Sequence, residues 1–452
     1  MADINNSSEI HSEHAVSPTQ EAFVCTTDLP KNQSTPYTLS LRANFIWAFI
    51  GNAIGNFCTW LLLVILTKLG TVSIVGILAI AQAVAMPISL LFGLKLHVVQ
   101  VTDAKNDYQF GHYLALRTLT AALAVLVTII IGFLCYTNYT AMVIALMAVS
   151  YAIISVREVF WSAMQKAERM DRIAISRILS GFLSLIMFGA IFRVTKSLML
   201  SIIGLTAARV IILMYDIPFV REITSGICNK LPTASLRPLW SKRILWNLTK
   251  LSFPLGLVAW LSALFLSIPR LFLDKYYGTE QVGYFAAISS LSAAGNMVLI
   301  ALGQTVTPRL SKYFVTNLRA YKILLLKLLG VGVFLAIICV TITVSFGRQI
   351  LTLLFKVDYA EHYDILIRLS IAWTVLFVFT FMNVGLQATR NFKQSVLIYS
   401  LAAFTCGVAS FCLIPTYGMI GAVWSLFGCY CVGFLGCSFF VNRAVAKQSQ
   451  LL

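Results

Sequence analysis

Acidic residues are scarce in this chain of 452 residues. There are 17 Asp and Glu against 34 Lys and Arg, and only 11% of the residues are charged, whereas 59% are hydrophobic. The mean hydropathy of +0.85 lies far outside the range of soluble globular domains. Long polar segments are scarce as well, since after residue 40 the longest one is the stretch 220–250. This leaves no room for a soluble nucleotide-binding or catalytic domain.

The signatures of common enzyme and metal sites are also missing. No P-loop, GxGxxG, GxSxG, HExxH or paired-carboxylate pattern occurs in the context that its chemistry requires. The ten cysteines form no CxxC and no Cys/His ligand spacing, so we interpret them as small hydrophobic residues. The sequence therefore predicts no enzyme, no metal site and no organic cofactor.

Apolar runs are what fill the sequence. Each is about the 20 residues that an α-helix needs to cross a hydrocarbon core of about 30 Å. The predicted spans are 44–66, 72–94, 116–136, 140–160, 176–195, 198–219, 251–272, 282–303, 323–346, 363–386, 395–414 and 419–441. We therefore predict an all-α polytopic membrane protein with about 12 transmembrane helices in two six-helix lobes.

The predicted lobes comprise residues 41–219 and 251–441, with the basic linker 220–250 between them. Residues 67–79 align with residues 274–286, matching Lys68 to Lys275 and Val75-Gly76 to Val282-Gly283. Six spans in each half give both lobes the same orientation, so a duplication would relate them by a pseudo-two-fold axis along the membrane normal.

The two ends of the chain are predicted to be tails. Residues 1–40 are polar, carry five of the 17 acids and lack the apolar core of a signal peptide, which indicates a disordered cytoplasmic tail. Residues 442–452, after the last span, are predicted to be a second cytoplasmic tail.

Lys and Arg are distributed unevenly between the two sides of the membrane. With a cytoplasmic N-terminus, the inward segments hold 22 of them, and the outward loops hold six, namely Lys68, Arg193, Lys196, Lys275, Arg348 and Lys356. This positive-inside pattern predicts that both termini are cytoplasmic. The basic excess is then a topology signal whose partner is the membrane lipid surface, and it does not indicate nucleic acid.

Inside the spans, cations outnumber acids, and no acid lies near the middle of any span. The cations are Arg117, Arg157, Arg209, Arg270, Lys327 and Arg368, and the acids, all near predicted helix ends, are Glu158, Asp216, Asp274 and Asp364. Ionisable groups in a bilayer are costly and often functional, and guanidinium groups bind phosphate oxygens bidentately. The asymmetry predicts an anionic substrate group and disfavours a pump for cations.

Structural interpretations compete with this one. Three cations near cytoplasmic ends can extend to the membrane interface, namely Arg117, Arg157 and Lys327. Two others have an acid four residues away on the same helix, Arg368 with Asp364 and Arg270 with Asp274.

Arg209 lies eleven residues into its span and has no evident local partner. Asn52, Asn56 and Thr59 form a polar stripe at helical spacing, which would either line a hydrated cavity or join helices through hydrogen bonds. The candidate substrate-binding residues are Arg209, Arg270, Arg368, Arg117, Lys327, Asn52 and Asn56. Coupling to H⁺ or Na⁺ stays open, because no acid at mid-span marks an ion site.

Four segments resemble a known family: LRANFIWAFIGNAIGNFCTWLLLVILTKLG, IPRLFLDKYYGTEQVGYFAAISSL, GRQILTLLFKVDYAEHYDILIRLSIAW and LIPTYGMIGAVWSLFG. They are similar to bacterial polysaccharide flippases, the O-antigen and exopolysaccharide exporters of the multidrug/oligosaccharidyl-lipid/polysaccharide exporter superfamily. The resemblance covers residues 41–441. At Arg270 the family often has an acid before the basic residue, whereas this chain has Pro269.

The resemblance implies a flippase of the bacterial inner membrane. It would move undecaprenyl-diphosphate-linked oligosaccharide repeat units to the periplasmic leaflet by alternating access around a cationic cavity. A polysaccharide polymerase and chain-length proteins are the partners that such a pathway implies. The alternatives are a lipid II flippase or a multidrug antiporter of the same superfamily, a membrane-embedded polymerase or ligase, and a scaffold for an assembly complex.

Overall fold

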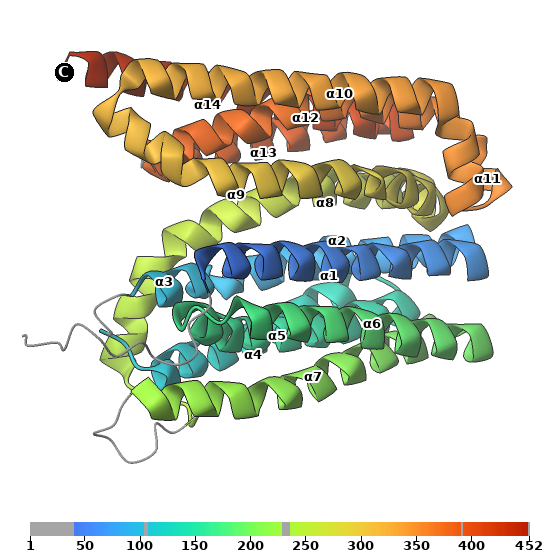
Figure 1. Ribbon diagram of the computed structural model, residues 1–452. Helices are drawn as coiled ribbons and strands as arrows, with labels where there is room; N and C mark the ends of the chain where they lie inside the picture. The colour runs from blue at the N-terminus through green and yellow to red at the C-terminus, as the bar shows by residue number, and fades with distance from the viewer. Residues whose placement is uncertain (1–39, 104–106, 228–235, 390–391, 451–452) are drawn as a thin grey trace, which may run out of the picture. The chain divides into compact units, whose positions relative to one another are not determined.

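The computed structural model describes residues 40–103, 107–227, 236–389 and 392–450, and within these ranges it contains helices and no strand. Leu39–Leu452 form one compact unit. The helices are α1 (Leu41–Leu69), α2 (Val72–Gly93), α3 (Leu96–Thr102), α4 (Phe110–Cys135), α5 (Asn138–Lys166), α6 (Met170–Thr195), α7 (Leu198–Ile227), α8 (Lys242–Ser290), α9 (Ser292–Thr316), α10 (Leu318–Leu354), α11 (Val357–Ala360), α12 (Tyr363–Ala388), α13 (Phe392–Tyr417) and α14 (Met419–Ser449). Figure 1 labels these helices.

Eleven of the described helices are long and apolar enough to cross a membrane, which confirms an all-α polytopic membrane protein. The predicted spans 251–272 and 282–303 lie on α8 and α9. Gly278, with φ 82° and ψ 176°, interrupts α8, so this long element is two helices that meet at a sharp turn. The first of the two predicted tails lies outside the described residues except for Ser40, which caps α1 through its side chain.

The predicted linker and the second tail are partly helical. α7 continues to Ile227 and α8 begins at Lys242, while residues 228–235 lie outside the described part of the chain. α14 continues to Ser449, beyond the predicted end of the last span at residue 441. Val445 in this extension is 7% exposed, so its burial against the lobe favours helix there.

The helices pack into two lobes. In the N-lobe, α1 packs on α6, α4 on α5, and both α5 and α6 on α7. In the C-lobe, α12 packs on α10 and α14, and α13 on α14. α8 joins them, because its first residues contact the N-lobe core while its later part packs against α2 and α13 (Figure 1).

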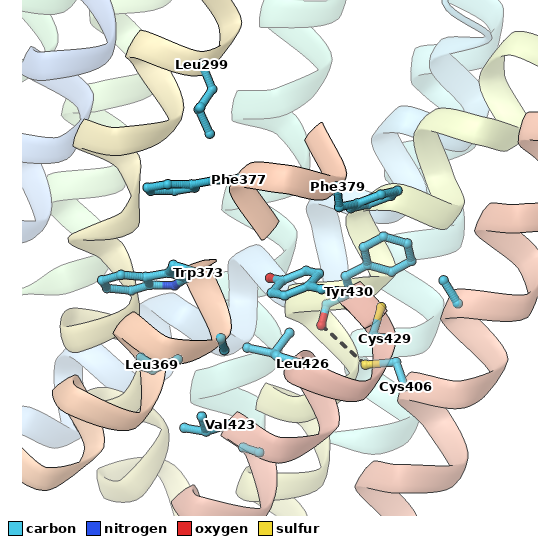
Figure 2. Packing of buried hydrophobic residues seen from close by; sticks show 14 of the residues in the cluster. Leu299, Leu369, Trp373, Phe377, Phe379, Cys406, Val423, Leu426, Cys429 and Tyr430 are labelled. Carbon is cyan, nitrogen blue, oxygen red and sulfur yellow. Dashed lines mark hydrogen bonds between the residues drawn. The ribbon is translucent and has the colours of Figure 1, made fainter. Parts of the chain in front are cut away.

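Aromatic side chains fill the core of the C-lobe. Figure 2 shows Trp373, Phe377 and Phe379 of α12 in this core together with Leu426 and Tyr430 of α14, and each of these is less than 5% exposed. Within lipid, no hydrophobic driving force brings apolar side chains together. Dispersion in such close contacts is therefore what holds membrane helices together.

The lobes meet where α2 crosses α8. A Cβ atom added to Gly76 would lie 1.8 Å from the carbonyl oxygen of Thr279, and one added to Gly283 would lie 2.2 Å from that of Val72. The glycines are the matched positions of the aligned segments 67–79 and 274–286, and Val72 and Thr279 are matched as well. Reciprocal contacts of this kind are what a two-fold axis produces. The duplication read from the sequence is therefore visible in the structure as a pseudo-symmetric crossing.

We expect Gly278→Ala to destabilise the protein by about 1–3 kcal/mol, because its backbone lies in a region of φ/ψ space that is essentially restricted to glycine. A Cβ there would meet nothing within 4 Å, so the cost would be backbone strain alone. Thermal unfolding in detergent would measure it. The control is Gly330→Ala in α10, where a Cβ also meets nothing but φ is helical. Equal melting temperatures for the two variants would contradict the prediction.

Candidate functional site: an arginine-lined cavity

A cavity of about 210 Å³ lies in the N-lobe among α1, α5, α6 and α7. Its polar lining is Asn52, Asn56 and Thr59 of α1, Arg157 and Trp161 of α5, Arg177, Ser180 and Ser184 of α6, and Arg209 of α7. Three arginines thus face one space, and among the described residues that line it there is no carboxylate. Two α1 glycines, Gly51 and Gly55, let α6 approach closely, since a Cβ on Gly51 would lie 2.5 Å from the Cα of Ala174.

Arg157 is the buried foundation of this site. Its side chain is 1% exposed, and its Nε donates to Asp216 Oδ2 of α7 at 3.4 Å. Nη1 donates to Ser180 Oγ at 2.8 Å and Nη2 to Ser176 Oγ at 3.0 Å, both on α6. The prediction that Arg157 extends to the membrane interface is wrong, because these partners solvate it inside the lobe. Asp216, expected near a helix end, is 0% exposed.

Trp161 links Arg157 to Arg177. The Cζ atoms of both arginines lie 4.7 Å from the centre of the indole ring, a distance at which cation–π attraction is effective. The indole Nε1 donates to Ser176 Oγ at 3.0 Å, which fixes the ring. Arg177 also donates to Asn52 Oδ1, while its Nε is buried without a hydrogen-bond partner. Arg177 is therefore held from two sides and retains donor capacity.

Arg177 is the site residue that sequence reasoning missed. Its charge is counted among the inward segments, whereas α6 begins at Met170 and carries Arg177 two turns into the helix. The sequence does hold a signal for Arg177, because Ser176 and Ser180 lie within one helical turn of it. Together they place three polar groups on an otherwise apolar segment.

Arg209 of α7 and Arg270 of α8 are the two predicted cations near Tyr151. Arg209 Nη1 donates to Ser150 Oγ at 2.5 Å, and the predicted absence of a local acid holds among the described residues. Arg270, on α8, donates to Ser289 Oγ at 3.5 Å, and no ion pair joins it to Asp274 in the described part of the chain. The predicted local pair is therefore not formed. Tyr151 of α5 lies near both arginines.

Neighbouring cations of the N-lobe lie close enough to repel one another. Arg177 interacts with Arg157, and Arg157 with Arg209, through unfavourable charge–charge contacts. Asp216 neutralises Arg157, whereas Arg177, Arg209 and Arg270 form no ion pair with a described carboxylate, although Glu158 lies near enough to attract Arg177. Fixed, partly desolvated guanidinium groups without counter-ions are suited to binding an anion.

The other predicted site residues lie away from the cavity. Arg117 is 1% exposed, not at the interface as predicted, because Glu158 Oε2 at 3.1 Å and the carbonyl oxygen of Gly93 at 2.7 Å accept its hydrogen bonds. Lys327 is exposed on α10. Arg368 forms the predicted pair with Asp364 at 3.9 Å and is 41% exposed. These three do not join the arginines around the cavity.

Arg117→Met should destabilise the fold rather than weaken anion binding. It leaves the Gly93 carbonyl and Glu158 without their donor, at a cost of about 1–3 kcal/mol for a charge-assisted hydrogen bond in a buried site. Thermal unfolding and the amount of folded protein in the membrane would measure this. Wild-type stability together with lost transport would contradict the structural role.

Comparison with known proteins places this geometry in a family. The polysaccharide biosynthesis protein family matches residues 41–314. The chain belongs to this family. The capsular polysaccharide biosynthesis protein CapF of Staphylococcus aureus is 25% identical over 391 residues, covering 85% of this chain and 94% of CapF.

Solved structures show the same fold. The lipid II flippase MurJ in its inward closed conformation superposes with a TM-score of 0.70 at 13% identity, covering 90% of each chain. A mutant form of the Vibrio cholerae MATE transporter VcmN superposes with a TM-score of 0.62 at 13% identity, covering 91% of this chain and 96% of that one. The chain is thus a multi-pass membrane protein of the polysaccharide biosynthesis protein family, with the fold of these solved structures, and the family is the one that its sequence resemblance implied.

Proposed function

We propose that the protein is a flippase for undecaprenyl-diphosphate-linked oligosaccharide repeat units of a surface polysaccharide, an O-antigen, exopolysaccharide or capsule. It carries them from the cytoplasmic to the outer leaflet of the bacterial inner membrane, with both termini in the cytoplasm. The observation that carries the proposal is the cavity lined by three arginines and by no carboxylate among its described lining residues.

The diphosphate is the part of such a cargo that resists transfer. Each of its phosphates is ionised at neutral pH, and removing that charge from water is expensive. Arg177 and Arg209 form no ion pair with a described carboxylate, and their described hydrogen bonds go to the neutral side chains of Asn52 and Ser150, so an anion has no ion pair to break at these two residues. A cationic drug would be repelled by the same residues, which disfavours a multidrug antiporter.

The size of the cavity fits a headgroup better than a whole ligand. Pockets that enclose drug-sized molecules measure about 300–1,000 Å³, whereas this cavity measures about 210 Å³. In the proposal the cavity holds the diphosphate, the sugars lie in the space between the lobes, and the polyprenyl chain stays in lipid.

The three arginines that line the cavity have different roles. Arg157 is saturated by Asp216, Ser176 and Ser180, so it supports the site and donates little to a ligand. Arg177 has an unpartnered Nε and Arg209 a single described hydrogen bond, so these two contact the phosphates. Trp161 is a positioning residue, because it holds Arg177 in place from beneath.

Arg177→Gln and Arg209→Gln should each reduce transport by about 10- to 100-fold, the loss expected for one charge-assisted hydrogen bond to phosphate. The measurement is flipping of the lipid-linked repeat unit in proteoliposomes, with lipid II as a second cargo that tests the alternative flippase. The matched controls are Lys327→Gln and Arg368→Gln, which remove equal charge outside the cavity. Controls that lose as much activity as the cavity variants would refute the proposal.

Replacing Trp161 should raise the KM for the lipid-linked cargo more than it lowers kcat. Trp161→Leu removes the cation–π contacts and the hydrogen bond to Ser176, so a rise of about 10-fold is expected. Trp161→Phe keeps a ring beneath the guanidinium groups and should raise KM about 3-fold. Trp424→Leu, at an exposed position of α14, is the control. A KM unchanged in Trp161→Leu would remove Trp161 from the positioning role.

A further inference from the structure

Two lysines join the lobes at the end of α1 that lies away from the cavity. Lys68, in the last turn of α1, donates from Nζ to the carbonyl oxygen of Thr352 at 3.1 Å. Lys356, just beyond α10, donates from Nζ to the carbonyl oxygen of Gly70 at 2.6 Å. The arrangement is reciprocal, because Lys68 of the N-lobe reaches the C-terminal end of α10 and Lys356 of the C-lobe reaches the C-terminal end of α1. We call these four residues the lysine latch.

The physical basis of the latch is the unsatisfied end of each helix. Thr352 lies in the last turn of α10, and Gly70 caps α1. Their carbonyl groups therefore belong to the negative end of a helix dipole and lack a partner within the helix. Among the described residues neither lysine forms an ion pair, and each therefore serves the other lobe. Separation of the lobes would expose both carbonyl groups and both ammonium groups together.

The glycine crossing lies beside the latch. Gly76 and Gly283 bring the backbones of α2 and α8 into contact, and Ser73 Oγ lies 3.2 Å from Thr279 Oγ1 across the same junction. The cavity lining on α1 ends at Leu62, six residues before Lys68 of the latch, which corresponds to about 9 Å at 1.5 Å per residue. The contact between the lobes thus lies beyond the cavity, toward the C-terminal end of α1.

We propose that the lysine latch and the Gly76–Gly283 crossing form the outer gate of the transporter. They hold the outer end shut while the cavity is loaded, and they must part for cargo to leave. "Outer" here follows the topology of the proposed function, on which this inference rests. The latch consists of hydrogen bonds between ammonium and carbonyl groups, and water can replace each partner when the lobes part.

A disulfide across the junction tests the gate. In a variant of the full chain with its native cysteines replaced, Ser73→Cys with Thr279→Cys places two thiols where the hydroxyl groups are 3.2 Å apart. The control is Ser89→Cys with Ser155→Cys, whose hydroxyl groups are 3.3 Å apart within the N-lobe. Oxidation should stop flipping by the first variant, and reduction should restore it. The control should cross-link and still transport.

Three outcomes of the cross-linking experiment would contradict the proposed gate. A Ser73/Thr279 cross-link that leaves transport intact would overturn the gate, and so would absence of that cross-link when the control forms. Loss of transport in both cross-linked variants would also contradict the proposal, because motion between the lobes would then not be the sensitive step.

A second measurement needs no cargo and so separates the gate from the proposed function. Lys68→Met and Lys356→Met should each increase, by about five-fold, the rate at which an impermeant thiol reagent labels Ser73→Cys from outside. Lys275→Met, the repeat counterpart of Lys68, is the matched control and should leave the rate unchanged. Equal rates in all three variants would overturn the latch even if flipping of the lipid-linked cargo were demonstrated.

Discussion

The ion pair between Arg157 and Asp216 is the interaction on which the rest of the site depends. A guanidinium group inside an apolar bundle is tolerated only when the protein replaces its lost water, and here Asp216, Ser176 and Ser180 do so. These partners tie α5 to α6 and α7. With Arg157 neutralised, Trp161 can hold a second guanidinium, that of Arg177, at the cavity, where it forms no ion pair with a described carboxylate.

The cavity and the contact between the lobes differ in how their polar groups find partners. Around the cavity, Arg157 is paired with Asp216, whereas Arg177 and Arg209 form no described ion pair, and in the proposed function these two guanidinium groups bind the anion. At the glycine crossing and the lysine latch, the contacting groups find their partners in the opposite lobe. The proposed flippase needs both conditions, a site that binds the anion and a contact between the lobes that can form and part.

Much of the fold could be predicted from the sequence, because span length and hydropathy depend on local composition. The duplication was visible because Gly76 and Gly283 must both be small where the lobes cross. The cavity was only partly predictable. Arg209, Asn52 and Asn56 line it, but the partners of Arg117 and Arg157 come from other helices, 41 and 59 residues away. No rule based on neighbours within a helix could find such partners.

The most direct test of a diphosphate-binding cavity is native mass spectrometry of the purified protein with a series of polyprenyl lipids. The account predicts that undecaprenyl diphosphate is retained, that the neutral alcohol is not, and that Arg177→Gln combined with Arg209→Gln abolishes retention of the diphosphate. Equal retention of the alcohol and the diphosphate, or unchanged retention by the double variant, would contradict it.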